Sequence, residues 1–158
     1  MSSKWFAMCL LLALAPSASR AAELSPPAAS ALTRALEDER HAESFYAAVI
    51  AKFGTVNPFA NIIGAEQRHS SRVIDLLTTY GVAVPPNPYE NGEKSKPSAP
   101  ASLAEACKAG VQAEILNRDL YDKELLPAVA AYPDIVRVFT ALRDASNENH
   151  LPAFRRCS

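Results

Sequence analysis

Hydrophobic residues recur every three or four positions in four long segments of the chain. This spacing is typical of amphipathic helices, because residues three and four apart lie on one helix face. No segment alternates with a period of two for long enough to form a strand. The pattern therefore predicts an all-α protein. The expected helices span about residues 26–53, 58–80 and 102–126, and a fourth runs from Pro133 to a frayed end near Pro152.

Start and stop residues lie at the ends of these segments. Ser25 precedes two prolines, a combination that favours the first turn of a helix, and Gly54 favours its end. Ser102 and Glu105 have the spacing of a capping box. Pro127 is expected to end the third helix, because proline lacks the N–H that a helix interior needs.

The connections between the helices predict how they pack. The first and last connections are short, whereas residues 82–101 are rich in proline and lack apolar periodicity. Short connections place helices antiparallel, and a long extended one can run the length of a bundle. We therefore expect a four-helix bundle made of two helical hairpins joined by a long crossover, with the second and third helices parallel.

Composition narrows the class of protein. The chain has 158 residues, of which 49% are hydrophobic and 21% charged, as expected of one globular domain. Its formal net charge is −1, so no basic excess favours nucleic acid or a membrane surface as a partner.

The first 21 residues have the pattern of a signal peptide. Lys4 precedes an apolar run over residues 5–15 that is too short to span a bilayer, and small residues follow up to Ala21. We expect cleavage there to leave residues 22–158 as a periplasmic or secreted domain that is not held in the membrane.

Export changes the interpretation of the cysteines. Cys9 would leave with the signal peptide, and Cys107 and Cys157 would remain. In an oxidising compartment such a pair favours a disulfide over two free buried thiols. The predicted topology also places the start of the third helix and the end of the fourth at the same end of the bundle.

Carboxylates and histidines lie within the apolar stripes, where a helix faces the core. An ionised carboxylate in a core is costly unless it is paired or coordinated, so several on facing helices indicate a bound cation. The candidate metal ligands are Glu39, Glu66, His69, Glu114 and His150.

The same residues form an internal repeat. Glu39 precedes Tyr46 by the same spacing with which Glu114 precedes Tyr121. Glu66-x-x-His69 on the second helix corresponds to Asn147-x-x-His150 on the fourth. One Glu from each of two helices, with Glu-x-x-His from the others, is the ligand plan of a di-iron or di-manganese carboxylate site.

The chain resembles the ferritin-like di-iron carboxylate superfamily, in particular its rubrerythrin-like branch and an uncharacterised family of exported ferritin-like domains. The resemblance is carried by ALEDERHAESFYAAVIAKFG, NPFANIIGAEQRH, ACKAGVQAEILNRDLYDKELL and NHLPAFRRC. It implies that Glu39, Glu66, His69, Glu114 and His150 occupy ligand positions, with Glu39 and Glu66 serving one metal or bridging two. It also implies chemistry with dioxygen, peroxide or ferrous iron.

The sequence departs from that plan at one position. Asn147 stands where a second Glu is expected, and an amide is a weaker ligand for a hard cation. Glu148 is adjacent but rotated by about 100° around the helix. Either residue is a candidate sixth ligand. A mononuclear site, a mixed site completed by His150 and a dinuclear site all stay open.

Two classes of function follow. The first is an exported iron or manganese oxidoreductase with ferroxidase- or peroxidase-like chemistry, in which Tyr46 and Tyr121 tune the site and an external reductant supplies electrons. The second is a non-catalytic, degenerate ferritin-like bundle without a metal, acting as a binding or envelope stress protein. In that case Glu39 would be solvated, Glu66 with His69 and His150 with Asn147 would be polar core pairs, and Glu114 would pair with Arg118. A homodimer is compatible with either class.

Overall fold

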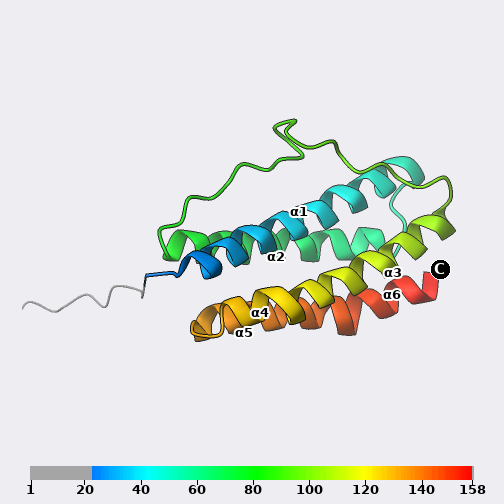
Figure 1. Cartoon of the computed structure of the whole chain (residues 1–158). Helices are drawn as coiled ribbons and strands as arrows, with labels where there is room; N and C mark the ends of the chain where they lie inside the picture. The colour runs from blue at the N-terminus through cyan, green and yellow to red at the C-terminus, as the bar shows by residue number, and fades with distance from the viewer. Residues whose placement is uncertain (1–22, 158) are drawn as a thin grey trace, which may run out of the picture.

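The computed structural model describes residues 23–157, and within that range all the regular secondary structure is helical (Figure 1). The predicted all-α helical bundle is confirmed. The signal peptide predicted over residues 1–21 lies outside the described residues. The elements are α1 (Pro26–Phe53), α2 (Phe59–Thr79), α3 (Leu103–Leu120), the π-helix η1 (Tyr121–Leu125), α4 (Leu126–Ala128), α5 (Pro133–Asp144), the π-helix η2 (Ala145–His150) and α6 (Leu151–Cys157).

The helices lie side by side as two antiparallel pairs (Figure 1). One pair is α1 with α2, and the other is α3 to α4 with α5 to α6. The connection from the end of α2 to the start of α3 runs along the outside of the bundle from one end to the other. It contains no helix, in agreement with its proline-rich sequence.

Capping residues set the helix ends as the sequence predicts. The Ser25 hydroxyl accepts a hydrogen bond from the Ala28 amide at 3.4 Å. At the start of α3, the Glu105 amide donates to Ser102 Oγ at 3.2 Å and the Ser102 amide donates to Glu105 Oε2 at 3.0 Å, which completes the capping box. Gly54 ends α1 with φ +83°, a conformation that side chains other than glycine rarely adopt.

The helical path continues through two prolines where the sequence predicts an end or fraying. Five π-helical residues precede Leu126-Pro127, and six precede Leu151-Pro152. A proline cannot donate to the carbonyl four residues earlier, and a wider π turn accommodates that missing bond without breaking the helix. The helical path is therefore continuous from α3 through α4 and from α5 through α6 to Cys157.

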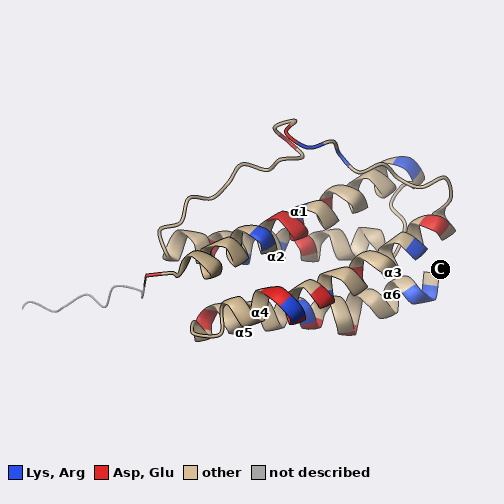
Figure 2. Cartoon of the chain, viewed as in Figure 1, with Lys and Arg blue, Asp and Glu red and all other residues tan. Residues whose placement is uncertain are grey.

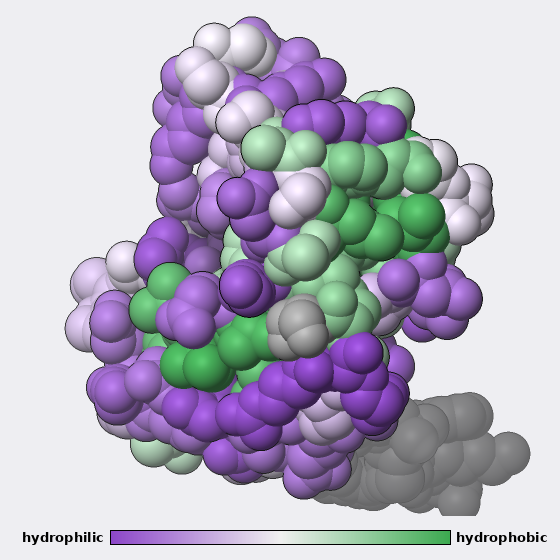
Figure 3. All heavy atoms as spheres, turned by 90° about the vertical axis from the view of Figure 1, so that its right-hand side faces the viewer, coloured by the Kyte–Doolittle hydropathy of each residue, from purple (hydrophilic) through white to green (hydrophobic). Residues whose placement is uncertain are grey.

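Two apolar clusters fill the bundle, one toward each end. The first contains Leu32, Leu36, Val73, Leu77 and Phe139 among others. The second, toward the α1–α2 turn, is built around Tyr46, Val49, Phe59, Ala106 and Phe154. Figure 3, which views that end of the molecule, shows hydrophobic side chains gathered between polar margins. On every long helix a stretch with buried polar residues separates the two clusters, so a polar layer crosses the middle of the bundle.

The structure pairs Cys107 with Cys157 in a disulfide, with their Cα atoms 5.7 Å apart. The bond joins α3 to the last turn of α6. The favoured pairing therefore agrees with the helix arrangement.

The surface is mixed in charge. Lys and Arg alternate with Asp and Glu along the helices in the view of Figure 2, and no continuous basic face is visible there. None of the helices within residues 23–157 combines the length and the apolar character that crossing a bilayer requires. The absence of nucleic-acid and membrane partners stays a prediction.

Close packing of α3 on α6 leads to the first test. A Cβ atom at Gly110 would lie 2.6 Å from the Phe154 ring, which itself packs against Tyr46 and Phe59. We expect Gly110→Ala to lower the free energy of unfolding by about 1–3 kcal/mol, because the ring has to move within a packed core. The matched variant is Gly64→Ala on α2, where the nearest atom would be 3.5 Å away. It should raise stability by about 0.5–1 kcal/mol through helix propensity. Urea unfolding of both variants checks this, and effects of the same sign would contradict it.

The disulfide gives a second test. Its 50-residue separation corresponds to about 4 kcal/mol in the chain-entropy treatment of cross-links. Reduction, or Cys107→Ser combined with Cys157→Ser, should therefore lower the melting temperature by on the order of 10 °C. Scanning calorimetry measures this, with thiol titration to confirm reduction. Identical melting of the oxidised and reduced protein would show that the cross-link does not stabilise the fold.

Candidate metal centre

Five acidic and histidine side chains meet in the polar layer between the two apolar clusters. They are Glu39 on α1, Glu66 and His69 on α2, Glu114 on α3 and His150 on η2. Each residue is at most 6% exposed. All the candidate ligands from the apolar stripes are thus brought together, and none of them lies on a solvated face.

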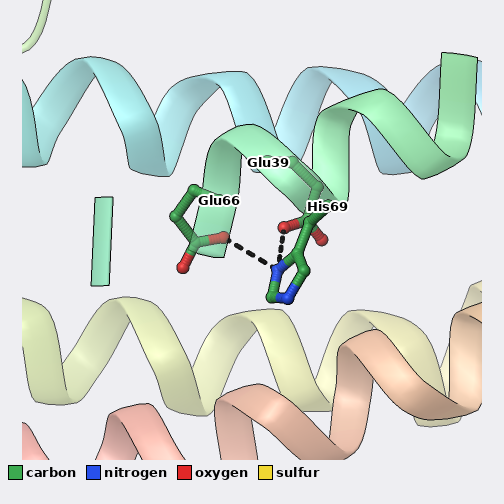
Figure 4. A group of neighbouring side chains, drawn as sticks. All are labelled: Glu39, Glu66 and His69. Atoms are coloured by element: carbon green, nitrogen blue, oxygen red, sulfur yellow. Dashed lines mark hydrogen bonds and ion pairs between the residues drawn. The ribbon is translucent and has the colours of Figure 1, made fainter. Parts of the chain in front are cut away.

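The first group consists of Glu39, Glu66 and His69. Nδ1 of His69 lies 3.1 Å from Oε2 of Glu39 and 3.2 Å from Oε2 of Glu66. Figure 4 shows these side chains projecting from the α1–α2 hairpin toward the facing hairpin. The three-residue spacing of Glu66 and His69 on one helix face places both side chains at the same level of the bundle.

The second group repeats the first across the bundle. Nδ1 of His150 lies 3.1 Å from Oε1 of Glu66 and 3.5 Å from Oε2 of Glu114. Both are ion-pair contacts, because the angles at this nitrogen satisfy a hydrogen bond with neither oxygen. Glu66 belongs to both groups, with one carboxylate oxygen facing each histidine.

Two tyrosines hold the outer carboxylates from the opposite hairpin. The Tyr46 hydroxyl on α1 donates to Oε1 of Glu114 at 2.5 Å, and the Tyr121 hydroxyl on η1 donates to Oε1 of Glu39 at 2.7 Å. Each hydroxyl orients one carboxylate and leaves its other oxygen facing a histidine. Burial and the adjacent carboxylates raise the pKa of both tyrosines, which keeps the hydroxyl protons in place.

Burial and close contacts redistribute the protons of this cluster. Burial raises the pKa of Glu39 to about 7, although its hydrogen bond with His69 opposes the shift. Burial disfavours the charge on His69, but hydrogen bonds with Glu39 and Glu66 outweigh it and raise the pKa to about 9. Burial also disfavours the charge on His150, but the close carboxylates of Glu114 and Glu66 outweigh it and raise the pKa of His150 to about 10. Burial acts to raise the pKa of Glu66, but the contacts with the two histidines outweigh it and lower that pKa.

The two groups can hold metal ions. In each group, three ligand atoms from two carboxylates and one imidazole lie within 4.8 Å of one another. Donor atoms that surround one ion at about 2.1 Å lie roughly 3 to 3.5 Å apart, which agrees with the contacts in both groups. Nδ1 of His150, which makes no hydrogen bond, becomes a metal ligand once the imidazole loses its proton to make room for a cation. Carboxylate with imidazole suits iron, manganese and zinc.

The structure differs from the sequence-based expectation at the sixth ligand position. Asn147 and Glu148 are both exposed, and Ser146 takes the buried place one position earlier. The reason is the π-helix η2, in which a wider turn changes which residues share a face with His150. Both side chains are exposed, whereas every member of the two groups is buried.

Sequence reasoning missed a chain of polar side chains beside the second group. Ser146 Oγ donates to Asn117 Oδ1 at 2.7 Å, and Asn117 Nδ2 donates to Asp38 Oδ2 at 2.8 Å. These bonds link η2, α3 and α1. The only sequence signal is that Asn117 lies one helical turn after Glu114 on the same face. Its partners depend on how the helices pack.

Glu114 does not form the intrahelical ion pair with Arg118 that would have turned it away from the site. Arg118 forms its ion pair with Asp119, at 2.7 Å, and Glu114 faces the core with its carboxylate between Tyr46 and His150. The intrahelical pairing of Glu114 with Arg118 is therefore not what the structure shows.

The chain is similar to a solved helical structure. This is the crystal structure of hypothetical protein MJ0754 from Methanococcus jannaschii DSM 2661, with a TM-score of 0.70 and 26% sequence identity over 89% of this chain and 84% of that one. No protein-family model matches the chain, and no curated protein matches it. The similarity supports the helical fold, and the function has to be argued from the site.

The proton distribution predicts how the metal-free protein responds to pH. Between about pH 6.5 and pH 9 the unfolded chain releases histidine protons that the folded protein retains on His69 and His150, so stability falls as pH rises. Glu39 adds a decrease of the same sign below pH 7, because its folded pKa lies above the unfolded value.

Thermal melting in the presence of a chelator should therefore show a melting temperature several degrees lower at pH 9 than at pH 6.5. The matched control is His69→Gln combined with His150→Gln, in which most of this slope should disappear. A melting temperature that is constant or rises over the same range would contradict the proton distribution.

Proposed function

We propose that the protein binds two ions of iron or manganese, one in each buried group, and uses them in ferroxidase- or peroxidase-like oxidoreductase chemistry. The observation that carries this proposal is the position of Glu66, whose two oxygens face two different histidines and two different outer carboxylates. A carboxylate shared in this way is suited to bridging two cations. Glu39 and His69 complete one set of donors, and Glu114 with His150 completes the other.

The donor count supports reaction with an external molecule. Each group offers three protein ligands, and sites that keep a coordination position open for a substrate commonly have this number. Bound iron or manganese would supply redox chemistry with dioxygen or peroxide. The ligand side chains are buried, and the tyrosine hydroxyls hold the outer carboxylates in position.

We further propose that the protein is an exported member of the ferritin-like superfamily. The ligand plan on four helices, the hairpin arrangement and the quoted sequence stretches support membership. The apolar run near the N-terminus and the disulfide support export, because disulfides persist in oxidising compartments. Since Cys107 and Cys157 are bonded to each other, electrons for turnover would come from an external reductant.

One observation favours the alternative, a metal-free bundle with a polar core. The carboxylates and His69 already bond to one another and to the two tyrosines. Such a network can specify helix register without a cation. The geometry at His150 argues against it, because its Nδ1 makes ion-pair contacts but no hydrogen bond, which a fully satisfied polar layer would provide.

Metal stoichiometry tests the proposal. The protein is loaded anaerobically with ferrous iron, desalted and analysed for iron per chain. We expect two ions in the wild type, one in Glu39→Gln, one in Glu114→Gln and close to none in Glu66→Gln, because only Glu66 belongs to both groups. The matched control is Glu43→Gln on α1, outside both groups, which should retain two ions.

Other stoichiometries have defined meanings. A folded wild type that retains no iron or manganese would establish the metal-free alternative. One ion that survives Glu114→Gln and is lost in Glu39→Gln would restrict the site to the first group. Oxidation of ferrous iron on exposure to air, measured in the same samples, should fall in parallel with the iron content.

A further inference from the structure

A cleft of about 490 Å³ opens between α1 and α3 and reaches the second group. Its volume lies within the range of pockets that hold small organic molecules. The apolar part of its wall is formed by Ala42, Phe45, Ala109, Ala113 and Leu116. Tyr46, Glu66 and Glu114 line its inner end.

The two groups contribute different numbers of residues to the lining of the cleft. Glu66 and Glu114 line it, whereas Glu39 and His69 do not. The second group contributes two carboxylates to the lining, Glu66 and Glu114, whereas the first contributes only the shared Glu66, so a molecule that enters between α1 and α3 mainly meets the second group. The exposed positions of Asn147 and Glu148 also leave this group without a further protein ligand.

The wall of the cleft indicates the chemical class of its occupant. Leu116 lines the cleft and is 68% exposed, so a bound molecule with an apolar body gains apolar contact by covering it. The ionisable residues lining the cleft are Asp38, His41, Glu66, Glu114 and Tyr46, and none of the lining residues is Lys or Arg. An apolar wall that ends in carboxylates disfavours anions and favours an uncharged molecule with an apolar body.

We propose that this cleft binds a small, uncharged, largely apolar organic molecule and places one end of it beside Glu66 and Glu114. Its role as a substrate site rests on the proposed metal function, whereas binding in the cleft does not. The inner end offers carboxylate oxygens and a tyrosine hydroxyl to a polar group on the molecule. The apolar side chains enclose the remainder.

Two fluorescent probes with the same skeleton test the proposal. N-phenyl-1-naphthylamine is uncharged, and 8-anilino-1-naphthalenesulfonate carries a sulfonate on that skeleton. We expect the neutral probe to bind the metal-free and metal-loaded protein at one site per chain. The sulfonate should bind the metal-free protein at least tenfold more weakly, because of the carboxylates.

Variants locate the bound probe. Ala109→Phe fills the cleft and should weaken binding of the neutral probe at least tenfold while the iron content stays unchanged. The matched control is Ala104→Phe, at an exposed position of the same helix that does not line the cleft, and it should bind as the wild type does. Leu116→Lys changes an exposed side chain and should both weaken the neutral probe and reduce the preference over the sulfonate.

The outcomes separate the two proposals. Iron binding without neutral-probe binding, or probe binding that Ala109→Phe leaves unchanged, would overturn the cleft and leave the metal function standing. Probe binding in a protein that retains no metal would uphold the ligand site and overturn the metal function. A dimer in size-exclusion chromatography that Leu116→Lys dissociates, with the probe bound only after dissociation, would assign the cleft to a second copy of the chain and overturn the proposal.

Discussion

The structure depends on how three carboxylates and two histidines are accommodated between two apolar clusters. Each charge would be costly there alone, so each is placed against an opposite charge or a hydroxyl donor. These contacts join all the long helices at one level, and the apolar clusters pack on either side of it. The polar layer therefore constrains the relative register of the two hairpins, so the candidate site also contributes to the fold.

The layer has an approximate twofold arrangement with Glu66 at its centre. Tyr46 extends from the first hairpin to Glu114, and Tyr121 extends from the second to Glu39, so each hairpin supports the carboxylate of the other. Each tyrosine also belongs to a different apolar cluster. A shift in either cluster would consequently move a carboxylate on the opposite hairpin, which couples core packing to the geometry of both groups. The symmetry ends at the cleft, which is lined by Glu114 and the shared Glu66 but not by Glu39.

Most of the fold and the five candidate ligands follow from local signals in the sequence, whereas the contacts around those ligands do not. Ser25, Gly54 and the capping box at Ser102 set helix ends through bonds within a few residues, so their effects are readable along the chain. Glu66 and His69 are equally readable, because an α-helix with uninterrupted hydrogen bonds keeps its periodicity. The bonds of Asn117 to Asp38 and Ser146 depend on the distance between helices, as does the cleft. The spacing of residues within a single helix does not predict the distance between helices.

The π-helix η2 also affects how motifs in chains of this kind should be compared. On α2 a spacing of three residues brings Glu66 and His69 to one level, whereas on η2 the buried neighbour of His150 is Ser146, four residues earlier. An alignment that holds the spacing constant pairs Asn147 with Glu66 and counts a ligand as lost by substitution. In the structure the buried residue one turn before His150 is a serine that bonds to α3. A search for remote relatives would therefore gain from allowing one extra residue between the acidic position and the histidine of the last helix.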